Sequence, residues 1–252
     1  MGSMGGSRHL KAINAPRYWP ILRKEYKWAV KPSPGPHPIS RSLPLLIIVR
    51  DMLGYAKTGK EARRLIAEGY FKIDGRVRRD YKFPVGVMDV IEIVGINKYY
   101  RVIPVPTKVL GLVEISREEA SFKLCRIENK TTVKNGHIQL NLHDGRNVLI
   151  RVNDPRNPVE DTYDTLGVLK LSIPVQQILD YIPLKEGVIA IVSGGRNVGR
   201  VGKIVSIHKG MRRYRSIVTL EDKQGNKFQT SLDYIFPIGV EKPLIKLPEG
   251  AW

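Results

Sequence analysis

The hydrophobic and polar positions of residues 43–103 predict two helices. The run "SLPLLIIVRDMLGYA" has a proline near its first turn and a glycine near its end, the asymmetry typical of a helix. "TGKEARRLIAEG" predicts a second, short helix, because Thr58 and Glu61 have the spacing of a capping box and Gly69 can end the helix.

A hairpin follows these helices. "YFKIDGRVRRD" alternates and then turns at Asp74-Gly75, a strong signal for a two-residue hairpin turn. "GVMDVIEIV", residues 86–94, is the expected partner strand. Residues 43–103, here called the helix–hairpin segment, therefore predict a compact α/β unit.

Residues 104–183, the central segment, alternate in several short runs and predict a small, mostly antiparallel β domain. Asn135-Gly136 and Asp144-Gly145 are its hairpin signals. "PVQQILDYIPL" near its end fits either a short helix or a connection. The single cysteine, Cys125, lies in the alternating run "SFKLCRI" and is expected to be an ordinary buried strand residue.

Residues 184–252, the C-terminal segment, contain the glycine-rich stretch "SGGRNVGRVGKIVSI". A nucleotide-binding P-loop needs a glycine five positions before its Gly-Lys pair and a hydroxyl directly after it, but Asn197 and Ile204 stand there around Gly202-Lys203. The continuation "KIVSI" alternates like a strand. We therefore expect a strand, a tight glycine turn and a second strand in a small barrel.

Residues 1–42, the arm, combine prolines, basic residues and aromatic rings. The block "KPSPGPHP" leaves no helical or strand period, which predicts an extended arm. Two tryptophans are unusual for a disordered linker. Its rings either stack on RNA bases or pack back on the next segment, and the sequence leaves both open.

Charge is the strongest signal in the composition. The chain of 252 residues has 42 Lys and Arg against 24 Asp and Glu, a net charge of +18. By segment the charge is +7, +5, 0 and +6 for residues 1–42, 43–103, 104–183 and 184–252. Such basic ends around a neutral middle predict a polyanionic partner and a central segment that faces protein or acts as a spacer.

Candidate RNA contacts follow from this distribution. In the arm they are the residues Arg17, Trp19, Arg23, Lys24, Lys27 and Lys31. The second helix, with Leu65 and Ile66 inward, offers Lys60, Arg63 and Arg64, and the hairpin adds Lys72, Arg76, Arg78, Arg79 and Lys82. In the C-terminal segment they are Arg196, Arg200, Lys203, Arg212 and Arg213, although a turn with merely solvated arginines is the alternative there.

The sequence offers no pattern for catalysis, a metal or a membrane. The five histidines have no metal-ligand spacing, and there is no nucleophile elbow. The longest clear apolar run, "LPLLIIV", falls far short of the roughly 18 residues that span a bilayer. We expect a cytoplasmic protein without cofactor, metal, membrane partner or small-molecule substrate.

Residues 41–93 resemble the S4-type RNA-binding domain, a helix–helix–hairpin module. With the upstream "HLKAINAPRYWPILRKEYKWAVKPSPGPHPISRSLPLL", nearly the whole chain is similar to the S4e family of small-subunit ribosomal proteins, closest in wording to archaeal members. The glycine-rich stretch resembles a KOW motif on an SH3-like barrel. The resemblance implies a multi-domain α+β protein: a basic aromatic arm (1–42), an S4-type module (43–103), a central antiparallel β domain (104–183) and a KOW-containing SH3-like barrel with a tail (184–252).

The same resemblance implies a structural protein of the small ribosomal subunit. It would bind small-subunit rRNA beside neighbouring ribosomal proteins, through basic surfaces and the arm, and would perform no reaction. Three other classes stay open at this point: an RNA-modifying enzyme, a KOW-type transcription-elongation factor and a free binder of tRNA or stress-related RNA.

Overall fold

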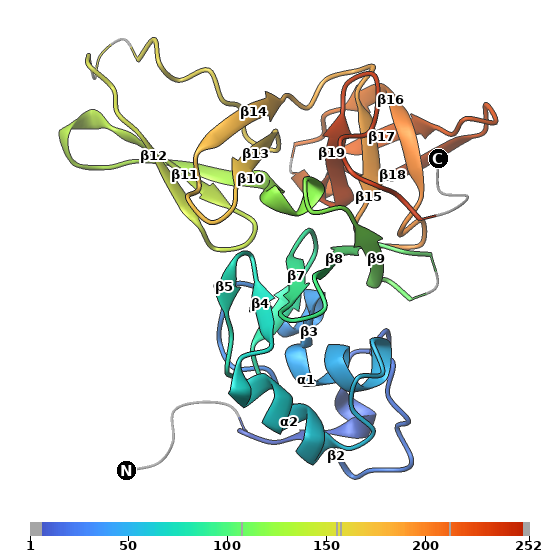
Figure 1. Cartoon of the computed structure of the whole chain (residues 1–252). Helices are drawn as coiled ribbons and strands as arrows, with labels where there is room; N and C mark the ends of the chain where they lie inside the picture. Colours follow the sequence, from blue (N-terminus) through green and yellow to red (C-terminus); the bar gives the residue numbers. More distant parts are fainter. Residues whose placement is uncertain (1–6, 107, 155, 157, 212, 249–252) are drawn as a thin grey trace.

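The computed structural model describes residues 7–106, 108–154, 156, 158–211 and 213–248. Figure 1 shows the arm and the helix–hairpin segment together in blue to teal, the central segment in green to yellow and the C-terminal segment in orange to red. Within the described residues, α-helix occurs only in the helix–hairpin segment. The fold is therefore β-rich and built of several sheets, with few helices.

The first helix is shorter than the apolar run that predicts it. Ser42–Pro44 forms strand β3, which pairs with β6 (Pro84–Gly86). The helix therefore begins only at α1 (Leu45–Ile47) and continues as one π-helical turn, η3 (Ile48–Met52). Every side chain from Leu45 to Val49 is buried, which explains an apolar run without a polar face.

The second predicted helix, α2 (Gly59–Glu68), is confirmed together with its cap. The Thr58 hydroxyl accepts a hydrogen bond from the Glu61 N–H at 3.2 Å, and the Glu61 carboxylate accepts one from the Thr58 N–H at 3.2 Å. Gly69 ends the helix with a φ of 93°, a conformation that favours glycine.

The hairpin turn at Asp74-Gly75 is also confirmed, with φ values of 49° and 75°. It joins the first two strands of an antiparallel sheet in the order β5-β4-β7-β8-β9. These strands are β4 (Phe71–Ile73), β5 (Arg76–Val77), β7 (Val90–Ile93), β8 (Lys98–Ile103) and β9 (Gly111–Ile115). Because β9 pairs with β8, this sheet continues past residue 103, where we drew a segment boundary.

The arm lies folded against the helix–hairpin segment. Two short strands, β1 (Leu10–Lys11) and β2 (Trp28–Ala29), pair with each other, and 3-10 turns span η1 (Ala12–Asn14) and η2 (Ile39–Arg41). The rest of its described backbone is irregular, as its prolines predict.

The central segment is the expected antiparallel sheet, in the order β12-β11-β10-β13-β14. Its strands are β10 (Phe122–Thr132), β11 (Ile138–Leu142), β12 (Asn147–Ile150), β13 (Val168–Ser172) and β14 (Ile178–Ile182), with 3-10 turns η4 (Glu119–Ser121) and η5 (Lys134–Gly136). "PVQQILDYIPL" is neither helix nor connection, because Ile178–Ile182 pairs with β13 at the edge of the sheet.

The C-terminal segment forms a third five-stranded antiparallel sheet, in the order β18-β17-β16-β15-β19. Its strands are β15 (Ile189–Val192), β16 (Val201–His208), β17 (Ile217–Glu221), β18 (Lys227–Ser231) and β19 (Ile235–Gly239), with 3-10 turns η6 (Arg213–Arg215) and η7 (Leu232–Tyr234). The predicted strand, glycine turn and strand are β15, the turn and β16.

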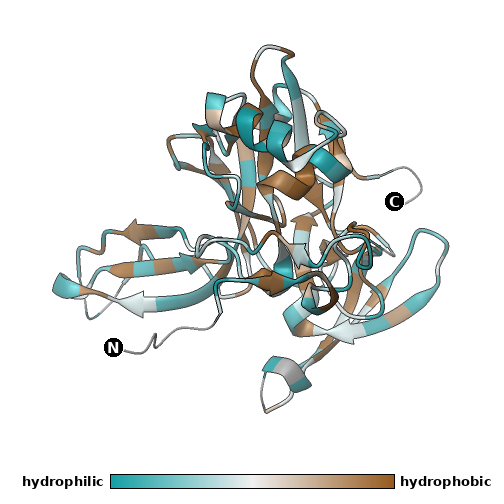
Figure 2. Ribbon diagram, turned by 90° about the horizontal axis from the view of Figure 1, so that it is seen from below, coloured by the Kyte–Doolittle hydropathy of each residue, from teal (hydrophilic) through white to brown (hydrophobic). Residues whose placement is uncertain are grey.

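Among the residues that the structure describes, three apolar cores hold the parts together. One joins the arm to the helix–hairpin segment, and one lies in the central segment, between side chains of β10, β11 and β13. The third lies mainly in the C-terminal segment. It also contains Met88 and Ile103 from the helix–hairpin segment and Leu124 from the central segment. In Figure 2 brown and teal alternate along many strands, as expected where one face of a sheet is buried. No helix in the described part of the chain is long and apolar enough to cross a membrane.

Candidate nucleic-acid interface

The exposed side of α2 carries three basic side chains. Ala62 and Ile66 turn into the core, so the 3.6-residue period leaves Lys60, Arg63 and Arg64 exposed. Arg64 pairs with Glu68 across one helical turn at 2.8 Å but remains largely open to solvent. Because these three side chains are exposed, they can contact a partner without disturbing the packing of α2.

The hairpin lies directly beside the end of α2. Gly69 is so close to it that an added Cβ would come within 3.7 Å of Arg79 Nε. Arg76 and Arg79 are exposed on this hairpin. We call these five exposed basic side chains of helix and hairpin the basic face, with Arg76 at the hairpin turn, nearest the central segment: Lys60, Arg63, Arg64, Arg76 and Arg79.

The other predicted hairpin residues are tied more closely to the protein. Lys72 pairs with Glu92 at 3.0 Å and is half-buried. The Arg78 guanidinium lies over the ring of Phe83 at 4.4 Å, and Lys82 Nζ is 5.5 Å from the ring centre of Tyr81. These three side chains partly stabilise the fold.

In the arm, the structure separates exposed from structural residues. Arg17, Lys24 and Lys27 are exposed, whereas Lys31 donates a hydrogen bond to the Ser7 carbonyl.

Trp19 and Arg23 hold the arm in place. The Trp19 ring is buried in the core, and its Nε1 donates to the Ser42 carbonyl at 3.1 Å. Arg23 donates to four carbonyls of the arm, including those of Ala15 at 2.9 Å and Pro16 at 2.6 Å. Neither side chain is accessible to an RNA base in this fold. Of the two alternatives for the rings of the arm, Trp19 therefore follows the one in which the ring packs on the next segment.

The glycine-rich turn is shaped by close packing. Added Cβ atoms on Gly194 and Gly195 would lie 2.8 Å and 3.2 Å from the Tyr234 ring. Gly199, with a φ of 78°, lies against Pro106 so closely that its Cβ would come within 2.3 Å of the proline nitrogen. The glycines therefore serve close backbone approach and positive φ.

The basic side chains around this turn differ in accessibility. Arg196 and Lys203 are exposed. Arg200 is also exposed, but it pairs with Asp222 at 3.1 Å and stacks on the Phe228 ring at 4.5 Å.

Arg213 joins two segments rather than facing solvent alone. It pairs with Glu128 of the central sheet at 2.8 Å and with Asp233 of the C-terminal segment at 2.6 Å. Arg126 crosses the same junction, because its Nη1 donates to the carbonyls of Asp233 and Ile235 at 2.9 Å and 2.7 Å. Arg212 lies outside the described residues.

A buried charge cluster at the junction of three segments was not predicted. Lys123 Nζ lies 2.8 Å from Asp74, 2.5 Å from Asp89 and 2.9 Å from Asp144. His37 of the arm adds a contact of 3.1 Å to Asp89. A signal existed in the sequence: the strand period of two places Lys123 on the same face as Cys125, whose burial was expected.

The electrostatics of this cluster favour its charged form. Burial alone would lower the pKa of Lys123, but attraction to Asp74, Asp89 and Asp144 raises it well above its ordinary value. Burial pushes the pKa of Asp144 up, yet the Lys123 ammonium, together with other nearby cations, lowers it to about 2. The same balance lowers the pKa of Asp89, with His37 as the largest attraction.

Cys125, His143 and Asp144 bring possible metal ligands within 4.8 Å of one another. Both ring nitrogens of His143 are engaged by main-chain groups, Nδ1 with an N–H and Nε2 with a carbonyl, each at 3.2 Å. The Asp144 carboxylate is bound by Lys123. Protein groups thus take the lone pairs that a metal would need, and the group packs the core.

Comparison with known proteins shows which family models the segments of the chain match. Residues 43–91 match the S4 domain, residues 4–40 match the RS4NT domain and residues 96–178 match the ribosomal family S4e. The arm, most of the helix–hairpin segment and most of the central segment thus match three consecutive family models, of which the third is a ribosomal family.

Whole-length relatives identify the family. The chain is 97% identical to the small ribosomal subunit protein eS4 of Desulfurococcus amylolyticus and 77% identical to that of Staphylothermus marinus, with 100% of each chain covered in both cases. The crystal structure of the 30S ribosomal protein S4e from Thermoplasma acidophilum is similar with a TM-score of 0.65 and 33% identity, over 79% of this chain and 95% of that chain. The chain belongs to the S4e family of small ribosomal subunit proteins.

Proposed function

We propose that this chain is a structural constituent of the small ribosomal subunit, which binds rRNA in the cytoplasm and performs no reaction. The observation that carries this proposal is its similarity, over the full length, to proteins named small ribosomal subunit protein eS4. The excess of basic residues and the S4 domain fit a polyanionic RNA partner.

Binding in this proposal rests mainly on phosphate neutralisation. The five exposed side chains of the basic face are carried by α2 and the hairpin, so their backbone is already ordered when they meet a phosphate backbone. Each neutralised phosphate releases counterions, which favours binding and makes it sensitive to salt. Lys72, Arg78 and Lys82 contribute from the helix–hairpin segment, and Arg17, Lys24, Lys27 and Lys31 from the arm.

A second basic edge is proposed on the C-terminal segment. Its five antiparallel strands and tight glycine turn suit an SH3-like barrel with a KOW motif, in which Arg196, Arg200 and Lys203 project around the turn. Arg213 and Arg212 belong to the neighbouring loop. We retain the four-part division at residues 42, 103 and 183 as functional segments, with the neutral central segment facing ribosomal proteins.

The experiment is a binding titration of the purified full chain with a small-subunit rRNA transcript at several salt concentrations. Replacing Lys60, Arg63 and Arg64 with Ala should weaken binding at least tenfold and reduce the salt dependence by roughly two to three released ions. The control replaces Lys108, Lys134 and Arg151, which are exposed in the neutral central segment, and should leave both quantities unchanged.

Equal affinity of the two triple variants would show that the basic face is assigned wrongly. Failure of the unmodified chain to bind the transcript, or to sediment with small subunits, would reject the function itself.

A further inference from the structure

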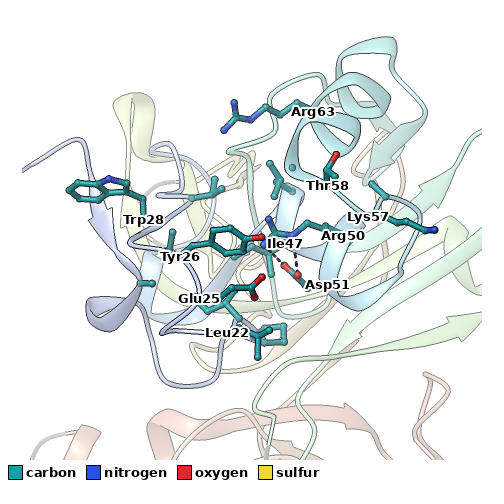
Figure 3. A pocket seen from close by; sticks show the side chains of 18 of the residues that line it. Leu22, Glu25, Tyr26, Trp28, Ile47, Arg50, Asp51, Lys57, Thr58 and Arg63 are labelled. Atoms are coloured by element: carbon teal, nitrogen blue, oxygen red, sulfur yellow. Dashed lines mark hydrogen bonds and ion pairs between the residues drawn. The ribbon is translucent and has the colours of Figure 1, made fainter.

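A groove of about 790 Å³ lies between the arm and the helix–hairpin segment. Its walls include Leu22, Tyr26 and Trp28 from the arm and Ile47 and Arg63 from the other side. Figure 3 shows the Tyr26 ring lying across the middle of the groove, with Arg63 above it and Leu22 below it. A volume of this size is in the range that accommodates a small ligand.

The aromatic rings of the arm divide into two pairs in this structure. Tyr18 and Trp19 pack inward and donate hydrogen bonds to the Ser42 carbonyl at 2.9 Å and 3.1 Å. Tyr26 and Trp28, in contrast, are 60% and 51% exposed at the groove. Large rings left in solvent on an ordered segment indicate a surface that a partner covers.

The backbone that carries Trp28 is ordered before any partner binds. Trp28 lies in β2, where it is the strand partner of Lys11 in β1. Next to this pair, the Ala12 N–H donates a hydrogen bond to the Lys27 carbonyl at 3.0 Å. Arg23 fastens the turn between these strands through its four carbonyl contacts. A ring on an ordered backbone loses less entropy on stacking than a ring on a disordered segment.

The charge of the groove favours an anionic partner. Its lining contains four basic side chains, Lys27, Arg50, Lys57 and Arg63, and two acidic ones, Glu25 and Asp51. Arg50 binds the Asp51 carboxylate with two hydrogen bonds of 3.0 Å and 2.9 Å, so these two charges offset each other. Lys27, Lys57 and Arg63 then remain against Glu25. Arg63 also belongs to the basic face, which makes the groove continuous with the proposed phosphate-binding surface.

We propose that this groove binds an unpaired nucleotide of the RNA, with its base stacked on Tyr26 or Trp28 and its phosphate directed to Arg63. The occupant would be a base that leaves the helix at a bulge or loop, because bases inside an RNA duplex cannot reach an aromatic ring. Stacking on aromatic side chains is tolerant of sequence, so we expect recognition of an extruded base rather than of one particular base. The proposal rests on the proposed function, since it places one contact within the same RNA interface.

The test compares variants of the full chain in the titration with small-subunit rRNA. The double variant Tyr26→Ala with Trp28→Ala should bind about tenfold more weakly, while its salt dependence stays that of the unmodified chain because the phosphate contacts remain. The double variant Tyr26→Phe with Trp28→Phe keeps both ring faces and should restore most of the affinity. Tyr70→Ala removes an exposed ring outside the groove and should have little effect.

Ultraviolet cross-linking of the complex gives an independent readout. Tyr26 or Trp28 should cross-link to a nucleotide that chemical probing identifies as unpaired. A cross-link of these residues only to paired nucleotides would overturn the proposal.

Failure of this proposal and failure of the proposed function give different results. If the unmodified chain binds rRNA and the Ala double variant binds equally well, the groove does not hold a nucleotide although the function stands. If rRNA binding is unchanged but incorporation into small subunits falls, the occupant is a protein segment, and the proposal is again wrong. An equal loss for Tyr70→Ala would remove the groove as the site, and absence of rRNA binding by the unmodified chain would reject both.

Discussion

At the scale of single residues, the ammonium group of Lys123 is the point where segments of the chain meet. It extends from β10 to Asp74 in the hairpin turn, to Asp89 before β7 and to Asp144 between β11 and β12. A charge this deeply buried is tolerated only because it is paired on several sides. The cluster therefore fixes how the helix–hairpin segment and the central sheet are oriented, and with them the basic face.

Replacing Lys123 with Met should lower the free energy of unfolding by about 3–5 kcal/mol, because three buried carboxylates lose their shared cation. Chemical denaturation at neutral pH measures this loss. Lys134→Met, at an exposed position, should change stability by less than about 0.5 kcal/mol. A loss equally small for Lys123→Met would mean that the cluster does not stabilise the junction.

His143 predicts how stability depends on pH. Burial lowers its pKa to about 4, so between about pH 6.5 and pH 4 the unfolded chain binds a proton that the folded chain does not. Stability should therefore fall by about 3 kcal/mol as the pH drops through this window. Below about pH 4, a further loss follows as the pH falls toward the pKa of Asp144, about 2.

Denaturation curves at pH 7, 5.5 and 4 measure this dependence. His143→Asn keeps an acceptor for the main-chain N–H but does not titrate, so its stability should change less over the same range. Replacing the exposed His208 with Asn should preserve the full dependence. If His143→Asn lost as much stability as the unmodified chain, another group would be responsible.

At the scale of elements, the glycine-rich turn between β15 and β16 shows why charge and glycine occur together. Gly199 brings the turn against Val105 and Pro106, in the connection between β8 and β9, while Arg196 and Lys203 stay in solvent. The glycine thus joins two segments, and the basic residues remain available to RNA.

Gly199→Ala should destabilise the protein more than Gly225→Ala. Both glycines have a positive φ, 78° and 81°, so both variants carry a similar backbone strain. Only at Gly199 would the new Cβ collide with neighbouring atoms, whereas nothing lies within 4 Å at Gly225. The overpacking should add about 1–3 kcal/mol to the loss, measured by thermal denaturation. Equal losses would argue against the packing of this turn on Pro106.

The elements that could be predicted from the sequence depend on local interactions. The cap of α2, its glycine stop and the turn at Asp74-Gly75 require only neighbouring residues. The pairing of Ser42–Pro44 with β6 and of Ile178–Ile182 with β13 depends on distant strands, and no local pattern announces it. The basic residues of the interface could be predicted from the distribution of charge along the chain. The inward positions of Trp19 and Arg23 could not be predicted, because they depend on tertiary packing.

At the scale of the whole molecule, the neutral central segment lies between basic parts and is tied to both. Lys123 and Arg146 join it to the helix–hairpin segment, and Arg126 and Arg213 join it to the C-terminal segment. The apolar core that contains Met88, Leu124 and Val188 also crosses these boundaries. The two basic surfaces are thus carried on one connected framework, which suits a protein that fixes rRNA helices relative to one another.

The central claim is that the basic parts of the chain bind small-subunit rRNA and the neutral middle does not. Cross-linking of intact small subunits, followed by mass spectrometry of the RNA-bound peptides, tests it most directly. We predict RNA cross-links from residues 7–42, 43–103 and 184–248, and mainly protein cross-links from residues 104–183. RNA cross-links concentrated in residues 104–183, or recovery of the chain only outside ribosomal particles, would contradict the account.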